Sequence, residues 1–236
     1  MTGPRIAVLD YGIGNLRSAE KALQKVGADA FLTASADEVR DADAVVLPGV
    51  GAFGACMDAL RSTGLESVVL GAVASGRPFL GICVGMQMLF SGSDEDPDAR
   101  GLGVIPGRVS WIPPGVKRPQ MQWNRLDVVK QVDPMFDGLL GGDTWMYFVH
   151  SLHGVPVDQS AVAATCEYGS TLNAAFRVDN VFATQFHPEK SSRDGLSLLA
   201  NFVEASRGLT LSSDRSARRQ GGSPSTGRLR RRDGLR

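Results

Sequence analysis

Residues 78–87 read Pro78-Phe79-Leu80-Gly81-Ile82-Cys83-Val84-Gly85-Met86-Gln87, and this stretch is the most informative of the sequence. An apolar strand runs directly into a cysteine that has a glycine two positions away on each side. A residue at the tip of a sharp strand-to-helix turn holds a strained backbone, and Gly81 and Gly85 remove the Cβ atoms that would clash where the chains cross. The pattern therefore predicts a nucleophile elbow with Cys83 at its tip.

The helix expected after the cysteine, over residues 84–90, bears on the chemistry of Cys83. Unpaired N–H groups and the helix dipole at its amino end favour a thiolate. A lone cysteine is more often a small buried residue without a chemical role. The symmetric glycines that follow a strand reverse that preference and favour a nucleophile.

A cysteine nucleophile needs a base, and the sequence offers three histidines: His150, His153 and His187. Residues 181–186 read as a buried strand that ends directly before His187. Open α/β sheets bind their ligands at the carboxyl ends of their strands, so this histidine is the best placed of the three. We therefore expect His187 to act as the base, and we assign no role to His153.

Glu189 completes the expected constellation. Pro188 fixes one dihedral angle between His187 and Glu189, so the carboxylate can turn back to orient the imidazole and to stabilise its protonated form. The alternative is a surface carboxylate paired with Lys190. The spacing favours a triad of Cys83, His187 and Glu189.

The residues around the expected triad resemble the class I glutamine amidotransferase family. Two runs carry this resemblance: Gly81-Ile82-Cys83-Val84-Gly85-Met86-Gln87 and Gln185-Phe186-His187-Pro188-Glu189-Lys190-Ser191. Further runs are similar to one branch of that family, the glutaminase subunits of imidazole glycerol phosphate synthases: Asp10-Tyr11-Gly12-Ile13-Gly14-Asn15-Leu16-Arg17-Ser18, Leu47-Pro48-Gly49-Val50-Gly51-Ala52-Phe53, Trp123-Asn124 and Tyr147-Phe148-Val149-His150-Ser151. The motifs span about residues 5–205, and so many in the right order are hard to explain by chance.

The resemblance implies an activity and a mechanism. The side-chain amide of glutamine is hydrolysed through a Cys83 thioester, with His187 serving first as base and then as acid. One oxyanion donor is expected to be the N–H of Val84, and the other the N–H of Val50 or Gly51 in a glycine-rich loop. Without the resemblance, that loop would read as an ordinary connection between a strand and a helix.

Other roles come from the resemblance alone. Glutamine is expected to be held by Gly49, Gln87, His150, Ser151 and Leu152, although His150 could instead be a structural histidine at a strand end. Ammonia released into water would be protonated and lost as a nucleophile, so a partner must receive it. The resemblance implies a (β/α)8-barrel cyclase, which makes imidazole glycerol phosphate in histidine biosynthesis and contacts Asn15, Trp123, Tyr147 and Lys190. The alternatives are a core position for Trp123 and a solvated charge for Lys190. No cofactor and no metal are implied.

The chain departs from the family in one motif. Where the family usually has a His-Met-Gly-Trp-Asn run, this chain reads Gln120-Met121-Gln122-Trp123-Asn124. A histidine and a glycine are therefore replaced. The change bears on the expected partner contacts and leaves the triad untouched.

Composition agrees with such a protein. A chain of 236 residues with 43% hydrophobic and 21% charged residues can bury one sizeable core, so one domain over residues 1–210 is expected. The three cysteines, Cys56, Cys83 and Cys166, form neither an even disulfide framework nor a metal-ligand spacing, which fits a reducing cytoplasm. The first residues lack a signal-peptide apolar region, and no apolar run approaches the roughly 18 residues of a membrane span.

The zero net charge hides an asymmetry between the body and the last residues. From Leu211 onward there are eight arginines and two aspartates, so the segment 211–236 carries +6 and the body −6. The segment from Ser212 is rich in Ser, Gly and Arg, and we expect it to be a disordered, dispensable extension. A nucleic-acid patch is the alternative, but no aromatic residue interleaves the arginines to stack a base.

The periodicity predicts the fold class. Apolar strands alternate with amphipathic helices early in the chain, with strands expected at 5–10, 31–32 and 44–47 and helices at 16–26 and 65–75. From about residue 108 to 185 strand follows strand, and a last helix is expected over 194–206. We therefore predict an α/β protein with an open, mostly parallel, doubly wound sheet of the flavodoxin-like type, helices on both faces and antiparallel strands in the second half.

Three alternative functions remain open from the sequence. Another class I glutaminase, serving pyridoxal phosphate, anthranilate or guanylate synthesis, would share the triad, but the motifs near residues 10–15, 48–53 and 147–151 argue against it. A self-sufficient cysteine hydrolase would process esters or peptides without a partner. A catalytically silent binding subunit is disfavoured by the intact Cys83, His187 and Glu189.

Overall fold

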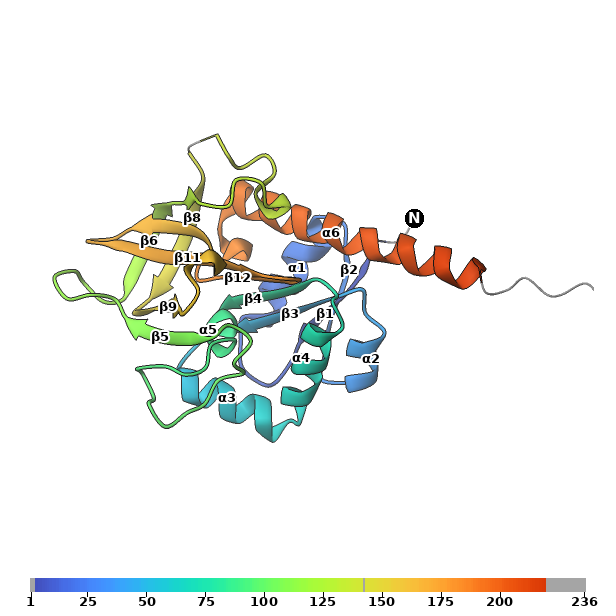
Figure 1. Ribbon diagram of the computed structural model, residues 1–236, viewed down its shortest axis with the longest axis horizontal. Helices are drawn as coiled ribbons and strands as arrows, with labels where there is room; N and C mark the ends of the chain where they lie inside the picture. The colour runs from blue at the N-terminus through green and yellow to red at the C-terminus, as the bar shows by residue number, and fades with distance from the viewer. Residues whose placement is uncertain (1–2, 142, 220–236) are drawn as a thin grey trace, which may run out of the picture.

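The computed structural model describes residues 3–141 and 143–219 (Figure 1). Its centre is an eight-stranded sheet in the order β2-β1-β3-β4-β12-β11-β10-β7. Five neighbouring strands of this sheet run parallel: β1 (Arg5–Leu9), β2 (Asp29–Thr33), β3 (Ala44–Gly49), β4 (Phe79–Cys83) and β12 (Val181–Thr184). The predicted parallel half of the sheet is confirmed.

The second half of the chain adds antiparallel strands, as its pattern predicted. The strands β7 (Asp127–Val128), β10 (Val162–Glu167) and β11 (Thr171–Val178) extend the large sheet in antiparallel pairs. Two further antiparallel pairs stand apart from it: β5 (Gly107–Trp111) with β9 (Leu152–Pro156), and β6 (Gln120–Arg125) with β8 (Trp145–His150).

Helices cover both faces of the large sheet. Figure 1 shows α1 (Leu16–Lys25) and α6 (Ser192–Arg219) on one face, and α2 (Ala36–Arg40), α3 (Phe53–Ser62) and α4 (Leu65–Ala74) on the other. The short α5 (Val84–Met88) follows β4, and three 3-10 turns complete the described elements: η1 (Pro134–Phe136), η2 (Gln159–Ala161) and η3 (Pro188–Lys190). Among the residues that the structure describes, no helix is both long and apolar enough to cross a membrane.

The central strands are buried along their whole length. Every residue of β3, β4 and β12 is buried, which explains why these strands read as continuous apolar runs without alternation. The helix α1 instead buries one stripe, on which Ala19 and Leu23 face the core. The carboxyl ends of β3, β4 and β12 therefore meet at one edge of a rigid sheet, where a site can be built.

Two helices were not anticipated, for different reasons. The start of α2 carries a local signal, because the Ser35 hydroxyl accepts the Glu38 N–H at 3.4 Å. The start of α3 has no side-chain cap of its own, and its Phe53 N–H is instead accepted at 2.8 Å by the Glu95 carboxylate, 42 residues further along the chain. A cap supplied from so far away leaves no local pattern.

The last helix is longer than expected. It begins at Ser192 and ends at Arg219, whereas the sequence predicted residues 194–206. Residues 212–219 of the expected extension continue this helix, and its remaining residues, 220–236, lie outside the described residues. A helix that has already nucleated gains one hydrogen bond per added residue, and no proline occurs between residues 192 and 223.

Candidate active site

Cys83 lies at the junction of β4 and α5 in a strained conformation. Its φ is 54° and its ψ −113°, a region that residues with a side chain rarely adopt. The flanking glycines are required by close packing: a Cβ on Gly85 would lie 1.9 Å from the Leu47 oxygen, and one on Gly81 would press on the α5 backbone at 3.1 Å. The predicted elbow is confirmed, with Cys83 at its tip.

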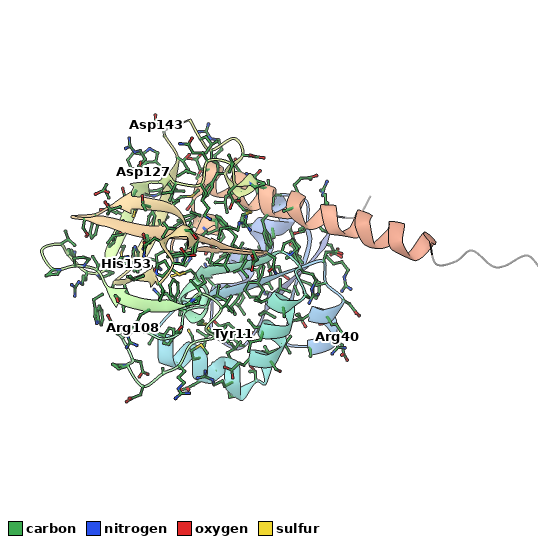
Figure 2. The ribbon with its side chains drawn as sticks, viewed as in Figure 1. Tyr11, Arg40, Arg108, Asp127, Asp143 and His153 are labelled. Atoms are coloured by element: carbon green, nitrogen blue, oxygen red, sulfur yellow. The ribbon has the colours of Figure 1, made fainter. Side chains whose placement is uncertain are left out.

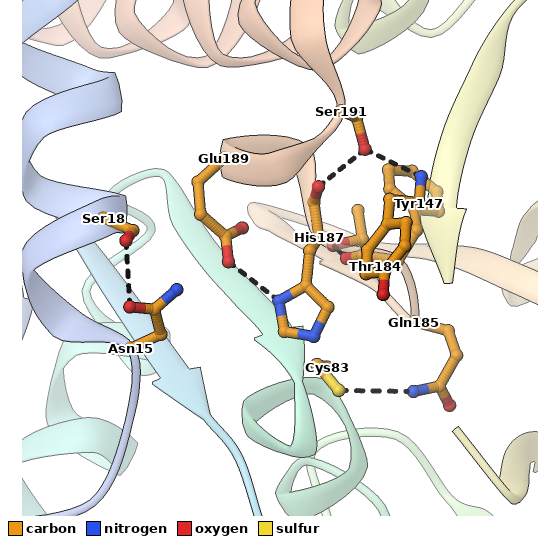
Figure 3. A network of polar contacts seen from close by, with 10 residues as sticks. Asn15, Ser18, Cys83, Tyr147, Thr184, Gln185, His187, Glu189 and Ser191 are labelled. Atoms are coloured by element: carbon orange, nitrogen blue, oxygen red, sulfur yellow. Dashed lines mark hydrogen bonds and ion pairs between the residues drawn. The ribbon is translucent and has the colours of Figure 1, made fainter. Parts of the chain in front are cut away.

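The fold brings the three residues of the expected triad together. Because β12 pairs in parallel with β4, His187 follows β12 at the same edge at which Cys83 ends β4. The His187 Nδ1 donates to Glu189 Oε1 at 2.8 Å, and both side chains are buried. Figure 3 shows the other ring nitrogen of His187 facing the Cys83 sulfur. The alternative of a surface ion pair between Glu189 and Lys190 is excluded.

The environment of His187 suits a base. Burial by itself lowers the pKa of the imidazole, but hydrogen bonds to Cys83 and Glu189, together with their charges, outweigh burial and raise the pKa to about 9. An imidazole with a raised pKa retains the proton that it takes from a thiol. The Cys83–His187 pair can therefore form a thiolate beside an imidazolium.

A buried amide chain leads to the nucleophile. Gln87 Nε2 donates to Gln185 Oε1 at 3.1 Å, and Gln185 Nε2 contacts Cys83 Sγ at 3.8 Å. Gln185 is fully buried at the end of β12 and received no role from the sequence. The sequence feature that could have identified Gln185 is a polar residue directly after an apolar strand. Gln87, expected to bind glutamine, therefore also orients a neighbour of Cys83.

The loop after β3 is held at two carbonyls. The Tyr11 hydroxyl donates to the Pro48 oxygen at 2.7 Å, and the Cys56 thiol donates to the Val50 oxygen at 3.3 Å. Burial raises the pKa of Cys56, so this thiol keeps the proton that it donates. The peptide that joins Gly49 to Val50 lies between the two anchored carbonyls. Tyr11 and Cys56 were not anticipated as site residues, because their contacts exist only in the folded chain.

A cavity of about 260 Å³ opens at Cys83. Its lining contains most residues that the sequence assigned to glutamine or to the oxyanion: Val50, Gly51, Val84, Gln87, His150, Ser151 and Leu152. Gly49 is the exception, since it belongs to buried β3 and does not line the cavity. Glu95 and Pro119 line it without having been predicted, and Glu95 also caps α3 through Oε2.

His150 is both a lining residue and a structural one. Its ring is buried, its Nδ1 lies 2.7 Å from the Leu152 oxygen, and its Nε2 lies 3.0 Å from Gln120 Oε1. Burial lowers the pKa of His150 to about 4, so the ring is neutral at pH 7. His153, labelled in Figure 2, lies on β9, which pairs with β5, and it is not among the lining residues of the cavity. The lowered pKa makes His150 a weaker base than His187, and both of its ring nitrogens already lie within hydrogen-bond distance of other groups.

One face of the β6–β8 sheet is apolar and open to solvent. Register places Met121 opposite Val149 and Trp123 opposite Tyr147, and the two aromatic rings meet edge to face at 6.0 Å. Trp123 is 45% exposed and Met121 62% exposed, so Trp123 is not a core residue. An exposed apolar cluster of this kind marks an interaction surface.

The open face connects directly to His187. The His187 N–H donates to the Tyr147 oxygen at 3.0 Å, and the Tyr147 N–H donates to Ser191 Oγ at 2.9 Å. The Ser191 hydroxyl in turn donates to the His187 oxygen at 2.6 Å, as Figure 3 shows. Asn15 lies near Glu189 in the same view, with its Oδ1 held by Ser18. The backbone of β8 is therefore bonded to the segment that carries the base.

Lys190 lies at the rim of the site, exposed and among the lining residues of the cavity. Its charge faces solvent, in agreement with the alternative interpretation of Lys190 as a solvated charge. Over residues 3–141 and 143–219, no cluster of three or more His, Cys, Asp or Glu side chains could hold a metal ion.

Comparison with known proteins agrees with this geometry. The family model described as glutamine amidotransferase class-I matches residues 7–205. Imidazole glycerol phosphate synthase subunit HisH of Methanothermobacter thermautotrophicus is 50% identical over 202 residues, which cover 86% of this chain and 99% of that protein. The subunit of the same name from Geobacter sulfurreducens is 48% identical over 207 residues, 85% of this chain and 98% of that protein.

Solved structures share the fold. A structure described as glutamine amidotransferase aligns with a TM-score of 0.68 at 24% identity, covering 86% of this chain and 98% of that one. The structure of PurLQS from Thermotoga maritima aligns with a TM-score of 0.70 at 20% identity, covering 88% of this chain and 99% of the matched one. At this level of identity the two structures support the architecture alone.

Proposed function

Because this chain belongs to the class I glutamine amidotransferase family and, within it, to the glutaminase subunits of imidazole glycerol phosphate synthase, we propose that Cys83 hydrolyses L-glutamine and that a cyclase subunit receives the ammonia. The proposal rests on a strained cysteine at a strand end, which faces a buried His187–Glu189 pair at the edge of the cavity. We expect such an enzyme to work in the cytoplasm, in histidine biosynthesis.

The reaction proceeds by acyl transfer to sulfur. His187 takes the Cys83 proton, and the thiolate attacks the carbon of the glutamine side-chain amide. The tetrahedral intermediate collapses when His187 returns the proton to the nitrogen, which leaves as ammonia and produces a thioester. A water molecule, deprotonated by His187, then attacks the thioester, and glutamate leaves as Cys83 regains its proton. Glu189 keeps the imidazole oriented and stabilises its charged form.

Backbone N–H groups stabilise the negative charge on the intermediate. The first residue of α5, Val84, presents its N–H beside the nucleophile, at the positive end of the short helix. The second donor comes from the loop after β3, through the N–H of Val50 or Gly51. Loss of one such donor typically costs about 2.7 to 4 kcal/mol of transition-state stabilisation.

The cavity offers groups that match glutamine. Glu95 is a carboxylate in the lining and suits the α-ammonium group of the substrate, while its other oxygen stays bonded to Phe53. Gln87 and the backbone of residues 150–152 supply neutral donors and acceptors for the remaining polar groups. Gly49 acts indirectly, because its missing side chain lets the loop pack against α5, where a Cβ would lie 2.5 Å from Gly85 N.

The open face of β6–β8 is the docking surface for the cyclase. Trp123 and Met121 form its apolar centre, Tyr147 links it to His187, and the relatives' names describe a subunit of a larger synthase. We expect the cyclase to be a (β/α)8 barrel that also contacts Asn15 and Lys190 at the rim. A shared interface is needed because ammonia released into bulk water is protonated and lost.

We expect the isolated chain to be a poor glutaminase. The Pro48 and Val50 carbonyls are anchored, so the peptide between Gly49 and Val50 is the unit that can turn its N–H away from the oxyanion. Closing the interface would turn it inward. The absence of one donor corresponds to about two to three orders of magnitude in rate, so the triad itself need not rearrange.

The test measures glutamate release by the chain alone, with the cyclase, and with the cyclase and its phosphoribulosyl aminoimidazole carboxamide nucleotide. We expect the rate to rise by about 10²- to 10³-fold across the series, in line with one restored oxyanion donor. Equal rates in all three conditions would contradict gating and would favour the self-sufficient hydrolase. No glutamate in any condition would contradict the proposed activity itself.

A further inference from the structure

Gln120 and His150 form a buried polar pair beside the cavity. The two residues lie directly opposite each other in the β6–β8 register, and Gln120 is fully buried. The Gln120 Oε1 position lies 3.0 Å from His150 Nε2, and the Nε2 position of the same amide has no hydrogen-bond partner. A buried donor without a partner costs about 1 to 3 kcal/mol, so this arrangement needs an explanation.

The protonation of His150 settles which end of the amide faces it. The Leu152 carbonyl can only accept, so His150 Nδ1, at 2.7 Å, must carry the proton. In the neutral ring, Nε2 is then a hydrogen-bond acceptor. An amide oxygen facing that nitrogen would set two acceptors against each other. The two ends of a glutamine amide have the same shape, and their assignment follows from their partners.

Turning the amide by half a rotation resolves both conflicts. Gln120 Nε2 then donates to His150 Nε2, and Gln120 Oε1 occupies the position that lacked a partner. The Gln120 side chain interacts with Cys166 on β10, and burial raises the pKa of Cys166 to about 12, so this thiol retains its proton and is available to donate to the oxygen. The result is a chain of donors that runs from Cys166 through Gln120 and His150 to the Leu152 carbonyl.

We propose that Gln120 is a positioning residue for glutamine binding: its amide nitrogen donates to His150 Nε2 and thereby holds the His150 tautomer that anchors Leu152. The inference rests on the proposed function, since it concerns the same cavity. Ser151 and Leu152 line that cavity, and the Ser151 carbonyl is held from the other side by the Ile112 N–H at 3.0 Å. The donor chain fixes the inner side of this turn, against which the substrate binds.

The first test is spectroscopic and needs no activity. Nitrogen-15 NMR of the imidazole rings in the full chain at neutral pH should show His150 protonated at Nδ1 and unprotonated at Nε2. In Gln120→Glu the carboxylate accepts only, so Nε2 should become protonated. A wild-type ring that carries its proton on Nε2 would overturn the proposal, and so would a Glu variant whose ring keeps the wild-type state.

The second test separates binding from chemistry in the complex with the cyclase. Gln120→Leu leaves His150 Nε2 without a donor, and we expect KM for glutamine to rise up to about tenfold, the equivalent of one hydrogen bond, with kcat nearly unchanged. Gln120→His should keep KM near that of the wild type, because an imidazole also offers a donor nitrogen. The matched control is Gln122→Leu, an exposed glutamine two residues along the same strand.

The outcomes distinguish the two proposals. An unchanged KM in Gln120→Leu, or an equal loss in the Leu and His variants, would overturn the positioning role while wild-type glutaminase activity persists. Absence of that activity in the wild-type complex would contradict the proposed function, and the NMR result would still decide the role of Gln120. Synthesis from added ammonium should be the same in all variants, because it bypasses the glutamine cavity.

Discussion

The Cys83 centre and the β6–β8 face differ in how far their side chains are buried and bonded within this chain. Around Cys83 the side chains are buried and bonded to one another, and His187 is held by Glu189 within the same chain. On the β6–β8 face, Trp123 and Met121 expose large apolar surfaces to solvent, at 45% and 62% exposure. This difference is what the proposed function requires, with the chemistry contained in one chain and delivery of its product dependent on a second surface.

The two regions are nevertheless joined by main-chain bonds. Tyr147 takes part in the open face with its ring and bonds to His187 and Ser191 with its backbone. A shift of β8 when a partner docks would therefore move the segment that carries the base. Physical coupling between partner and chemistry needs only this one contact layer.

The largest effect on activity is expected from the loss of the nucleophile. We expect Cys83→Ala to lower glutamine hydrolysis by at least about 10³-fold, because no other thiol lines the cavity and a triad acts as a unit. The complex should still make product from added ammonium salts. Glu189→Gln should be milder, since it removes only an orienting group. Glutaminase turnover retained in the Ala variant would refute the assignment.

Removing the centre of the open face should leave the chemistry intact. For Trp123→Ala we expect affinity for the cyclase to fall by about 2 kcal/mol or more, the range of a buried aromatic hot spot, with the basal rate and melting temperature of the isolated chain unchanged. Titration of the chain with the cyclase measures the affinity. Val132→Ala is the control, because Val132 is 96% exposed but lies outside the β6–β8 sheet. Equal affinities for the two variants would contradict the docking surface.

The hydrogen bonds of Ser191, which link the β6–β8 face to His187, can be removed without changing either region itself. Ser191→Ala removes the hydroxyl that accepts the Tyr147 N–H and donates to the His187 oxygen, so we expect activation by the cyclase to drop about tenfold, in keeping with one or two lost hydrogen bonds. The measurement is the ratio of glutamate release with and without the cyclase. Ser197→Ala is a matched control, because its hydroxyl bonds only to Arg193 on the same helix. An unchanged ratio in Ser191→Ala would mean that coupling runs elsewhere.

The two buried histidines respond to pH in opposite directions. Burial lowers the pKa of His150 from 6.5 to about 4, so the unfolded chain binds a proton more readily than the native one as the pH falls below 6.5. We expect roughly 2 to 3 kcal/mol of unfolding free energy to be lost between pH 6.5 and 4, since one pKa unit is worth about 1.4 kcal/mol. The raised pKa of His187 has the opposite sign and costs stability only as the pH rises from 6.5 through about 9.

Denaturant titrations of the wild type and of His150→Gln across this acid range provide the measurement. The variant lacks the titrating ring, so its stability should depend less steeply on pH. Parallel curves for the two proteins would show that His150 does not carry the acid sensitivity.

The smallest effect is expected at the end of the chain. We propose that the domain ends near residue 210, and that deleting residues 212–236 leaves the melting temperature and the glutaminase rate within error, because this segment holds few apolar residues to bury. Thermal unfolding and glutamate release of the shortened chain test this. A large loss of stability or of cyclase binding would mean that the extension docks on the body.

The linear pattern of residues was sufficient to predict the features that depend on neighbours along the chain. The glycines at positions 81 and 85 predicted the elbow, the apolar runs predicted the parallel strands, and the spacing of His187 and Glu189 predicted their hydrogen bond. These features are set by backbone sterics, by period and by short spacing, which a linear pattern records directly.

Contacts between residues that are far apart in the sequence became apparent only in the folded chain. Glu95 caps α3 from 42 residues away, Tyr11 and Cys56 anchor the loop after β3, and Gln120 meets His150 across two strands. The helical state of residues 212–219 was also missed. Side-chain partners of this kind depend on how the elements pack, and one polar residue can find its partner at many positions, so no spacing in the sequence selects among them.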